Sequence, residues 1–419
     1  MEEKMKTKKI IVILVVLAMM LNIAACSQPQ ESTTAAPTTA TPTTAAPTEA
    51  PKEPIVIGGL TSLSGGLMDY GNQMQRGFLL GLEYATNGTM MVAGRPIEVI
   101  WEDTTTVPEV ARERAIKLLD EDEVDMIVGP TSSSDAFAIL GLAEEYETVF
   151  ILEPAAADFL TGEVANRYIF RTGRNTAQDA AAMAAVMAGS KVSIFAPDSA
   201  FGRAYTDPFK PALEAAGGEV LVEEYAPLDS TNFTPYIQRI IDSNPDYCFV
   251  IWAGANDPWR QMTEMGLFEA TKVSTGAPEI AALRNMMQLE GMPGFTLYYH
   301  GVAQNPVNEW LVEKHMERFD TPPDVFVSGG MAAAMAAVKA FETTNGSTDA
   351  EDLIQAMRGM EFDSPTGMRY FRSEDHQAQQ VLFEITYTKV DGVDHIVPEL
   401  VRVIPIEEIY NPIQTTHPR

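Results

Sequence analysis

The stretch VGPTSSSDA, Val128 to Ala136, gives the first clear indication of the fold of this 419-residue chain. The apolar run VDMI leads into it, a Gly-Pro turn stops that run, and the helical pattern FAILGLAEEY follows. The order predicts a buried strand, a turn and a helix in direct succession. Four hydroxyl residues, Thr131 to Ser134, occupy the turn. Capping the helix requires only one of them, so the others are candidates for holding a ligand. The alternative is that all four serve capping and turn formation.

The same alternation of short apolar strands and longer helices extends along most of the chain. Strands are expected at 55–60, 96–103, 124–129, 148–153, 191–197, 219–227 and 246–254. Helices are expected at 71–86, 108–122, 135–146, 176–188, 203–216, 233–243 and 257–266. This order is typical of βαβ units and parallel sheets. Strands covered on both faces read as continuous apolar runs, as these do.

The alternation pauses near YIFRTGRN, residues 168–175, and then starts again. An α/β fold of two similar Rossmann-like lobes with a cleft between them accounts for that pause. Ligands of open α/β sheets bind beyond the carboxyl ends of the strands, where the serine turn is expected. Two lobes that close on a ligand by a hinge are a known class of conformational switch.

The N-terminus has the order of a secretory signal: basic residues 4–9, an apolar run at 10–21, and small residues before Cys26. The run is short for a membrane span, which needs about 20 residues. The sequence LNIAACS resembles a bacterial lipobox, which implies that residues 1–25 are a lipoprotein signal peptide. Cys26 then becomes the lipidated first residue of the mature protein. An ordinary cleaved signal with a chance cysteine is the alternative.

Residues 26–53 are almost entirely Thr, Ala, Pro and other polar residues. Such a segment cannot bury enough apolar surface to fold, so we expect a disordered tether. Together with an acylated Cys26 it predicts a lipid-anchored body on the outer face of the bacterial cytoplasmic membrane. The formal net charge of −29 would repel phosphate backbones and argues against nucleic-acid binding.

The chain carries no recognisable catalytic or metal-binding pattern. Its five histidines lack metal-ligand spacing, and there is no nucleophile elbow, no phosphate-binding loop and no dinucleotide fingerprint. Cys248, in the apolar run YCFVIW, is expected to be a buried core thiol. We therefore expect a protein that is not an enzyme and that uses no cofactor and no metal.

Three loops are expected at strand ends of the first lobe: TSLSGGLMDYG, GPTSSSDA and EPAAADF. Their small residues let a ligand approach the backbone, and a helix start offers free N–H groups to an anion. Tyr70 lies in a glycine-bounded stretch, expected to be a loop, and is a candidate to cover an apolar ligand. Trp252, Asn256 and Trp259 follow a strand of the second lobe and are candidates for the opposite wall. For Tyr70 and Trp252 the alternative is a core aromatic residue.

Residues 54–400 are similar to the solute-binding lipoproteins of branched-chain amino-acid type ABC transporters, which have the type I periplasmic-binding-protein fold. The resemblance rests on the order and spacing of several motifs. They are IVIGGLTSLSGGLMDYGNQMQRG, EVIWEDTTTVPEVARERAIKLL, VDMIVGPTSSSDA, FILEPAAADFLT, YIFRTGRNTAQDA, FAPDSAFGRAY and NFTPYIQRIIDSNPDYCFVIWAG. It implies lobe 1 at 54–175 and 301–378, and lobe 2 at 176–300 and 379–419, joined by three crossovers near 175, 300 and 379.

The resemblance also implies a set of ligand contacts. The Ser132 backbone and the Ser133 hydroxyl match the family's contacts to a ligand carboxylate. Ala155, Ala156 and Ala157 match the second carboxylate loop, although amino-acid binders usually have Thr or Ser where this chain has Ala157. Tyr70 matches the aromatic residue over the ligand side chain.

The second lobe departs from the branched-chain pattern. Thr176 stands where those binders have an acid for the ligand ammonium, and Glu279 matches a second such acid across an uncertain gap. An ammonium buried without enough carboxylate is costly. A small carboxylate without an amine would suit the change, with Arg174 or Asn175 contacting it.

The sequence thus predicts the binding component of an ABC importer, whose partners are a small carboxylate-bearing solute, the permease and the lipid bilayer. A sensing module of the same fold, which reports its ligand to a receptor, is the alternative. The sequence leaves open whether the solute is an amino acid or an aromatic or aliphatic acid, and leaves open affinity and oligomeric state.

Overall fold

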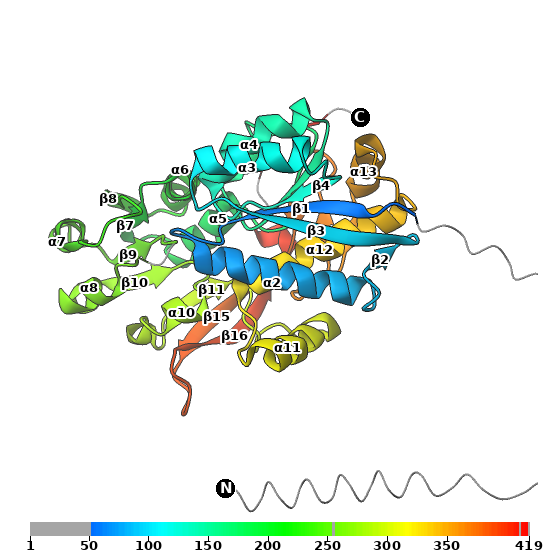
Figure 1. Cartoon of the computed structure of the whole chain (residues 1–419). Helices are drawn as coiled ribbons and strands as arrows, with labels where there is room; N and C mark the ends of the chain where they lie inside the picture. The colour runs from blue at the N-terminus through cyan, green and yellow to red at the C-terminus, as the bar shows by residue number, and fades with distance from the viewer. Residues whose placement is uncertain (1–51, 254–255, 410–411, 418–419) are drawn as a thin grey trace, which may run out of the picture. The chain divides into compact units, whose positions relative to one another are not determined.

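The computed structural model describes residues 52–253, 256–409 and 412–417, and Pro51–Arg419 form one compact unit (Figure 1). The signal peptide, Cys26 and nearly all of the tether lie outside the described residues. The fold within the compact unit is built on two mainly parallel sheets and two small antiparallel ones.

The first sheet has six strands in the order β2-β3-β1-β4-β5-β6, and only the β2–β3 pair is antiparallel. Its strands are β1 (Ile55–Thr61), β2 (Met91–Val92), β3 (Arg95–Asp103), β4 (Met126–Val128), β5 (Val149–Leu152) and β6 (Ile169–Arg171). The pairing of β1 with both β3 and β4 makes it central. The carboxyl ends of β1, β4 and β5 therefore lie at one edge of the sheet.

Helices cover both faces of this sheet, as Figure 1 shows. They are α2 (Met68–Ala85), α3 (Pro108–Asp120), α4 (Ser133–Glu145), α12 (Val325–Thr343) and α13 (Ala350–Met357). Helices α2 and α12 pack closely, because glycines stand at their contact: a Cβ on Gly77 would lie 1.9 Å from the Val327 carbonyl oxygen. Alanine at that position would push the two helices apart.

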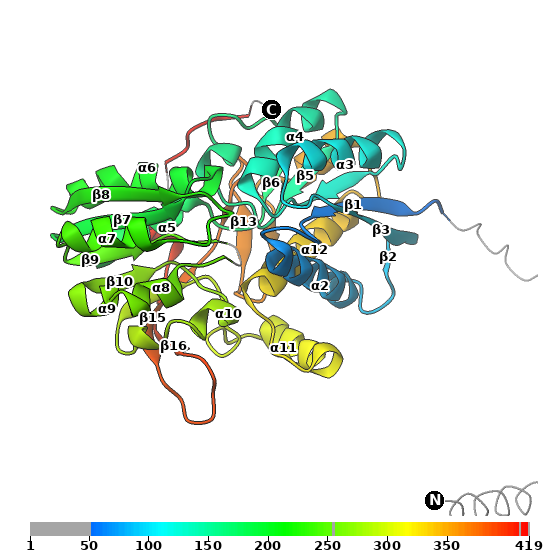
Figure 2. The same ribbon diagram turned by 60° about the vertical axis from the view of Figure 1, so that its left-hand side comes forward.

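The second sheet is wholly parallel and has the order β10-β9-β7-β8 (Figure 2). Its strands are β7 (Lys191–Pro197), β8 (Glu219–Ala226), β9 (Tyr247–Val250) and β10 (Lys272–Thr275). The associated helices are α5 (Thr176–Val186), α6 (Ala200–Ala215), α7 (Thr234–Asp242), α8 (Trp259–Glu264), α9 (Leu267–Ala270) and α10 (Ile280–Leu283). The strands expected at 191–197, 219–227 and 246–254 are confirmed within one to four residues.

Two antiparallel sheets complete the compact unit. One contains β11 (Pro293–Thr296), β15 (Leu382–Thr388) and β16 (Val397–Ile404), and the other contains β12 (Glu361–Phe362), β13 (Arg369–Phe371) and β14 (Ala378–Gln379). The remaining helices are α11 (Pro306–Phe319) and the 3-10 turns Asp158–Thr161, Met287–Leu289 and Ile406–Glu408. The α/β class with parallel, Rossmann-like sheets is confirmed. The lobe boundaries near 175, 300 and 379 stay predictions.

Helix α12 is the one described helix that is long and apolar enough to cross a membrane. Most of it is buried against α2 and the first sheet, because residues from Met331 to Phe341 are almost all inaccessible to solvent. Helix α12 is therefore a core helix of the compact unit.

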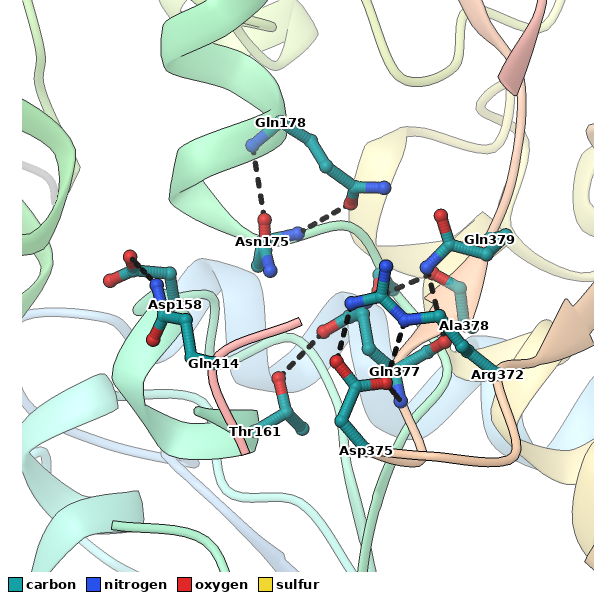
Figure 3. A network of polar contacts seen from close by, with 11 residues as sticks. Asp158, Thr161, Asn175, Gln178, Arg372, Asp375, Gln377, Ala378, Gln379 and Gln414 are labelled. Carbon is teal, nitrogen blue, oxygen red and sulfur yellow. Dashed lines mark hydrogen bonds and ion pairs between the residues drawn. The ribbon is translucent and has the colours of Figure 1, made fainter. Parts of the chain in front are cut away.

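The segment that leaves the first sheet after β6 is fastened to the segment before β14. Figure 3 shows Gln377 as the central side chain of this contact: its amide oxygen accepts from the Thr161 hydroxyl at 2.8 Å. Its amide nitrogen donates to the carbonyls of Gly173, at 2.7 Å, and Ala378, at 3.0 Å. Two of the three expected crossover segments, near 175 and near 379, are thus in direct contact.

Candidate functional site

The serine turn lies between β4 and α4, at the carboxyl edge of the first sheet. Ser132 is the residue that caps the helix: its hydroxyl oxygen accepts from the amides of Ser134 and Asp135, at 3.2 and 3.3 Å. Thr131 faces the neighbouring strand, where its hydroxyl lies 2.6 Å from that of Thr61. One hydroxyl therefore caps, as expected, and a second joins β1 to the turn.

Ser133 joins the serine turn to the alanine loop, residues 155–157, which follows β5. Its hydroxyl oxygen accepts from the amides of Ala156, at 3.2 Å, and Ala157, at 3.1 Å. A serine hydroxyl has two acceptor sites and one proton to donate. Both acceptor sites are occupied, so the proton remains for a further acceptor.

The alanine loop is held from behind by a buried cation. Arg171, at the end of β6 and fully inaccessible, donates to the carbonyls of Ala156 and Ala157, at 3.1 and 2.7 Å. Burial lowers the pKa of the Arg171 guanidinium to about 9, because the charged form loses solvation. Thr176 fastens the far end of the loop: its hydroxyl accepts from the Asp158 amide at 3.0 Å, and its amide donates to the Ala156 carbonyl at 2.9 Å.

A cavity opens beside the serine turn, which we call the serine cavity. Its volume is about 520 Å³ with the open mouth included, within the usual range for small-molecule sites. Its walls combine hydroxyl groups with apolar and aromatic side chains and one cation. They are Leu67, Tyr70, Thr131, Ser132, Ser133, Ser134, Pro154, Ala156, Arg174, Ser199, Phe201, Leu228, Ala253 and Phe326. This lining contains no acidic residue.

A second cavity, the acidic cavity, lies beyond Tyr70 at the carboxyl ends of β9 and β10. It is lined by Tyr70, Trp252, Asp257, Trp259, Thr275, Gly276, Ala277, Pro278, Glu279, Ala282 and Met286. The Tyr70 ring stacks on Phe326 at 4.1 Å between centroids, and the Tyr70 hydroxyl donates to the Glu279 carboxylate at 3.3 Å. Tyr70 thus belongs to both cavities.

The acids around the acidic cavity have raised pKa values. Burial raises the pKa of Glu279 to about 7, and the nearby Asp324 carboxylate adds to the rise. Burial also raises the pKa of Asp324, to about 6, and that of Asp257. Glu279 is therefore partly protonated at neutral pH.

The structure brings many of the predicted site residues together and leaves others out. Tyr70, Ser132, Ser133 and Ala156 line the serine cavity, whereas Trp252 and Glu279 line the acidic cavity. Ala155 and Ala157, in the alanine loop, and Thr176, which bonds to it, are buried and do not line either cavity. Asn256 is exposed, and its carbonyl accepts from the Trp252 indole at 2.9 Å.

The expectation that Tyr70 sits in a loop is wrong. Helix α2 begins at Met68, so Tyr70 is in its first turn. The expectation read Gly71 as loop punctuation, but Gly71 is helical and is needed for close approach. A Cβ there would lie 1.9 Å from the Ser62 carbonyl oxygen. The helix fixes the direction of the Tyr70 side chain more firmly than a loop would.

Several lining residues were not singled out from the sequence as contacts. Phe326 begins a helix 256 positions after Tyr70, and nothing in its local pattern distinguishes it from a core residue. Phe201 and Ser199 lie in the quoted motif FAPDSAFGRAY, so their strand-end position was a usable signal. Asp257 lies in the loop between β9 and α8, which was a comparable signal.

Among the described residues no group of three or more His, Cys, Asp or Glu side chains is placed to hold a metal ion. Cys248 is buried and free, as expected, and burial raises the pKa of its thiol. The chemistry that this site offers is recognition through hydrogen bonds, one cation and apolar contact.

Loops of both parallel sheets border a hydroxyl-rich cavity, an arrangement typical of proteins that bind a small solute. Comparison with known proteins agrees, since the model of the periplasmic binding protein family matches residues 54–389. The chain belongs to that family. Its fold is the type I periplasmic-binding-protein fold, and it is a solute-binding protein of the ABC-transporter class.

Three relatives illustrate the similarity. The Leu/Ile/Val-binding protein homolog 6 of Brucella suis is 24% identical over 335 residues, which are 75% of this chain and 84% of the relative. An ABC-type branched-chain amino acid transporter protein of Rhodopseudomonas palustris CGA009 is 42% identical, with a TM-score of 0.75, over 86% of this chain and all of that one. A solute-binding protein of R. palustris BisB5, solved with 3,4-dihydroxybenzoic acid, is 26% identical, with a TM-score of 0.76, over 84% and 97%.

Proposed function

We propose that this protein captures a small carboxylate-bearing solute in the serine cavity and delivers it to an ABC permease. The ligand carboxylate accepts from the Ser133 hydroxyl and lies against the start of α4 and Ala156. The apolar part of the ligand lies between Tyr70, Phe326 and the side chains of Phe201 and Leu228. The observation that carries this proposal is the Ser133 hydroxyl, whose two acceptor sites are filled while its proton is left to donate.

The electrostatics of the serine cavity favour an anion. The start of α4 contributes the positive end of a helix dipole and amides without helical partners. Arg174 is the one charged residue of the lining. Because the lining includes one cation and no acid, a carboxylate fits there better than a cationic group.

The ligands in the relatives' names support the same chemistry. One relative is named for leucine, isoleucine and valine, and another was solved with 3,4-dihydroxybenzoic acid. These compounds share a carboxylate attached to an apolar body. They differ in the amine, which only the amino acids carry.

Delivery follows from the arrangement of the lobes. A ligand that contacts the loops of both lobes stabilises the conformation in which the lobes are close, because it binds that state more tightly. The permease would then recognise the closed form. We propose further that Cys26 is acylated and that the body stands outside the cell, on the outer face of the cytoplasmic membrane.

The test is a thermal-shift comparison of carboxylates with their amides. The pairs are L-leucine with leucinamide, 4-methylpentanoate with 4-methylpentanamide, and benzoate with benzamide. Ligand at about 100 times its Kd stabilises the folded protein by about 2.7 kcal/mol. At least one acid is expected to raise the melting temperature where its amide does not. If no acid exceeds its amide, the carboxylate proposal fails.

A further inference from the structure

The cation of the serine cavity is fixed in place by a buried partner. Arg174 lies between β6 and α5, at the first crossover between the sheets, and its side chain is 13% exposed. Its Nε donates to the Oδ2 atom of Asp179 at 2.9 Å, and the Asp179 side chain is 2% exposed. Asp179 is in the first turn of α5, so the helix fixes the position of its backbone.

This bond uses only Nε and leaves the two terminal nitrogens of the Arg174 guanidinium available to a ligand. Arg174 lines the serine cavity and also the adjoining small cavity next to Glu153 and Arg369. In the part of the chain that the structure describes, its two terminal nitrogens have no hydrogen-bond partner, since Asp179 takes only Nε. A planar guanidinium whose Nε is anchored presents its terminal nitrogens in a fixed direction, which suits a carboxylate.

Among the described residues, the lining of the serine cavity offers no carboxylate to an ammonium. None of its lining side chains is acidic. Two acids contact lining side chains without lining the cavity themselves: Asp179 is paired with Arg174, and Glu279, which belongs to the acidic cavity, accepts from the Tyr70 hydroxyl. An ammonium placed in the serine cavity would be desolvated beside Arg174 with no carboxylate to pair with, which is costly.

We propose that Arg174 is a specificity-determining residue that selects organic acids without an amine, and that Asp179 is the positioning residue that aims it. The inference rests on the proposed capture of a carboxylate. The ligand carboxylate bridges Ser133, on lobe 1, and Arg174, at the crossover into lobe 2, while an aliphatic or aromatic body fills the apolar part of the cavity. Through Arg174 and its partner Asp179, the anion is connected to α5 of lobe 2.

The experiment compares amino acids with their deaminated partners on the full mature chain. The probes are L-leucine against 4-methylpentanoate and phenylglycine against phenylacetate, titrated by calorimetry. An amine-free acid is expected to bind at least about tenfold tighter than its amino partner. If an amino acid binds as tightly as its partner or more so, the inference is overturned while the capture of carboxylates stands. If no acid of either kind binds, both fall together.

Variants of Arg174 distinguish a role in selecting the ligand from a role in supporting the fold. Arg174→Gln is expected to weaken the winning acid by about 10- to 100-fold, the usual worth of a hydrogen bond to a charged group. The same variant should leave amino-acid binding nearly unchanged, so that the ratio of the two affinities collapses. Arg174→Lys restores part of the ratio because the charge remains. A ratio unchanged in Arg174→Gln overturns the proposal.

Asp179→Asn tests the positioning role. The substitution keeps the side-chain shape and one acceptor oxygen but removes the charge that holds the Arg174 Nε. The ratio of the affinity for the amine-free acid to that for the amino acid should therefore fall, by a smaller factor than in Arg174→Gln. The matched control is Arg167→Gln, which removes an arginine from the same segment that pairs with Glu351 and lines neither cavity. Melting temperatures of all variants are measured without ligand, so that a folding defect is seen separately. An Asp179→Asn ratio equal to that of the control contradicts the positioning role.

Discussion

The Ser133 hydroxyl oxygen accepts from the Ala157 amide at 3.1 Å, and this bond joins loops that follow two different strands. The loops belong to β4 and β5, which are neighbours in the first sheet. The geometry explains three of the four hydroxyls in the row that follows β4, because each of the three has a separate partner. Ser132 caps the helix, Thr131 bonds to Thr61, and Ser133 ties down the alanine loop.

Ser133→Ala is expected to lower the affinity for the bound acid by about tenfold or more, because a donor to a charged group is lost. Isothermal titration measures the change. Ser132→Ala is the matched control: it removes a neighbouring hydroxyl that caps α4 but keeps the main-chain amide. It should cost about 1 kcal/mol of stability and little affinity. Equal affinities for Ser133→Ala and the wild type would show that the hydroxyl is only structural.

Arg171→Met should weaken ligand binding, because Arg171 holds the alanine loop in place beside the serine cavity. The substitution removes one charged donor from each of the carbonyls of Ala156 and Ala157, which keep the amides of Thr176 and Leu160, and each lost bond is expected to cost about 1.5–3 kcal/mol. Urea unfolding is expected to show the loss of stability, and calorimetry a weaker affinity for the acid. Arg171→Lys retains one donor and should be intermediate. Full affinity in a destabilised Arg171→Met protein would contradict the role of this guanidinium in shaping the loop.

Glu279→Gln should change how stability depends on pH. A carboxyl group whose pKa is about 7 in the folded protein and 4.5 as a free group binds its proton more tightly when folded. Its contribution therefore falls as the pH rises from about 4.5 to 7 and is constant above. Glutamine has no such dependence. The variant should gain about 1–3 kcal/mol over the wild type between pH 5 and pH 8, measured as the difference of their unfolding free energies.

One outcome would contradict the prediction for Glu279→Gln. If the difference between the two proteins is the same at pH 5 and pH 8, Glu279 does not titrate in this window. Glu264→Gln is the control for removing a carboxylate, because among the described residues that glutamate is exposed on α8 and pairs with Arg260. Its unfolding free energy is measured at the same two pH values.

Cys26 is expected to carry the lipid anchor. Bacteria that express the full chain with a labelled fatty acid should incorporate label, and Cys26→Ser should abolish it and release the protein from the membrane fraction. Cys248→Ser is the control, because that thiol is buried in β9 and inaccessible to acylation. Label that persists in Cys26→Ser would show that the lipobox resemblance is misleading.

Most of the fold was predictable from sequence because it depends on local patterns. Continuous apolar runs such as Met126 to Val128 form parallel strands since helices cover them on both faces. The Ser132 cap was equally predictable, since hydroxyls before a helical run satisfy its first amides. The first turn of α2 was missed because Gly71 resembles a turn residue, and only the contact with Ser62 reveals its purpose.

The sequence by itself determined the strand and helix order and the serine turn at a strand end, and it predicts a secretory signal at the N-terminus. The tertiary structure alone decided which side chains meet. Tyr70 contacts Glu279 across 209 residues, and Arg171, Thr176 and Ser133 converge on one short loop. The physical reason is that periodicity and capping act within a few residues. Contacts between segments far apart depend on how the helices and sheets pack, which no local pattern encodes.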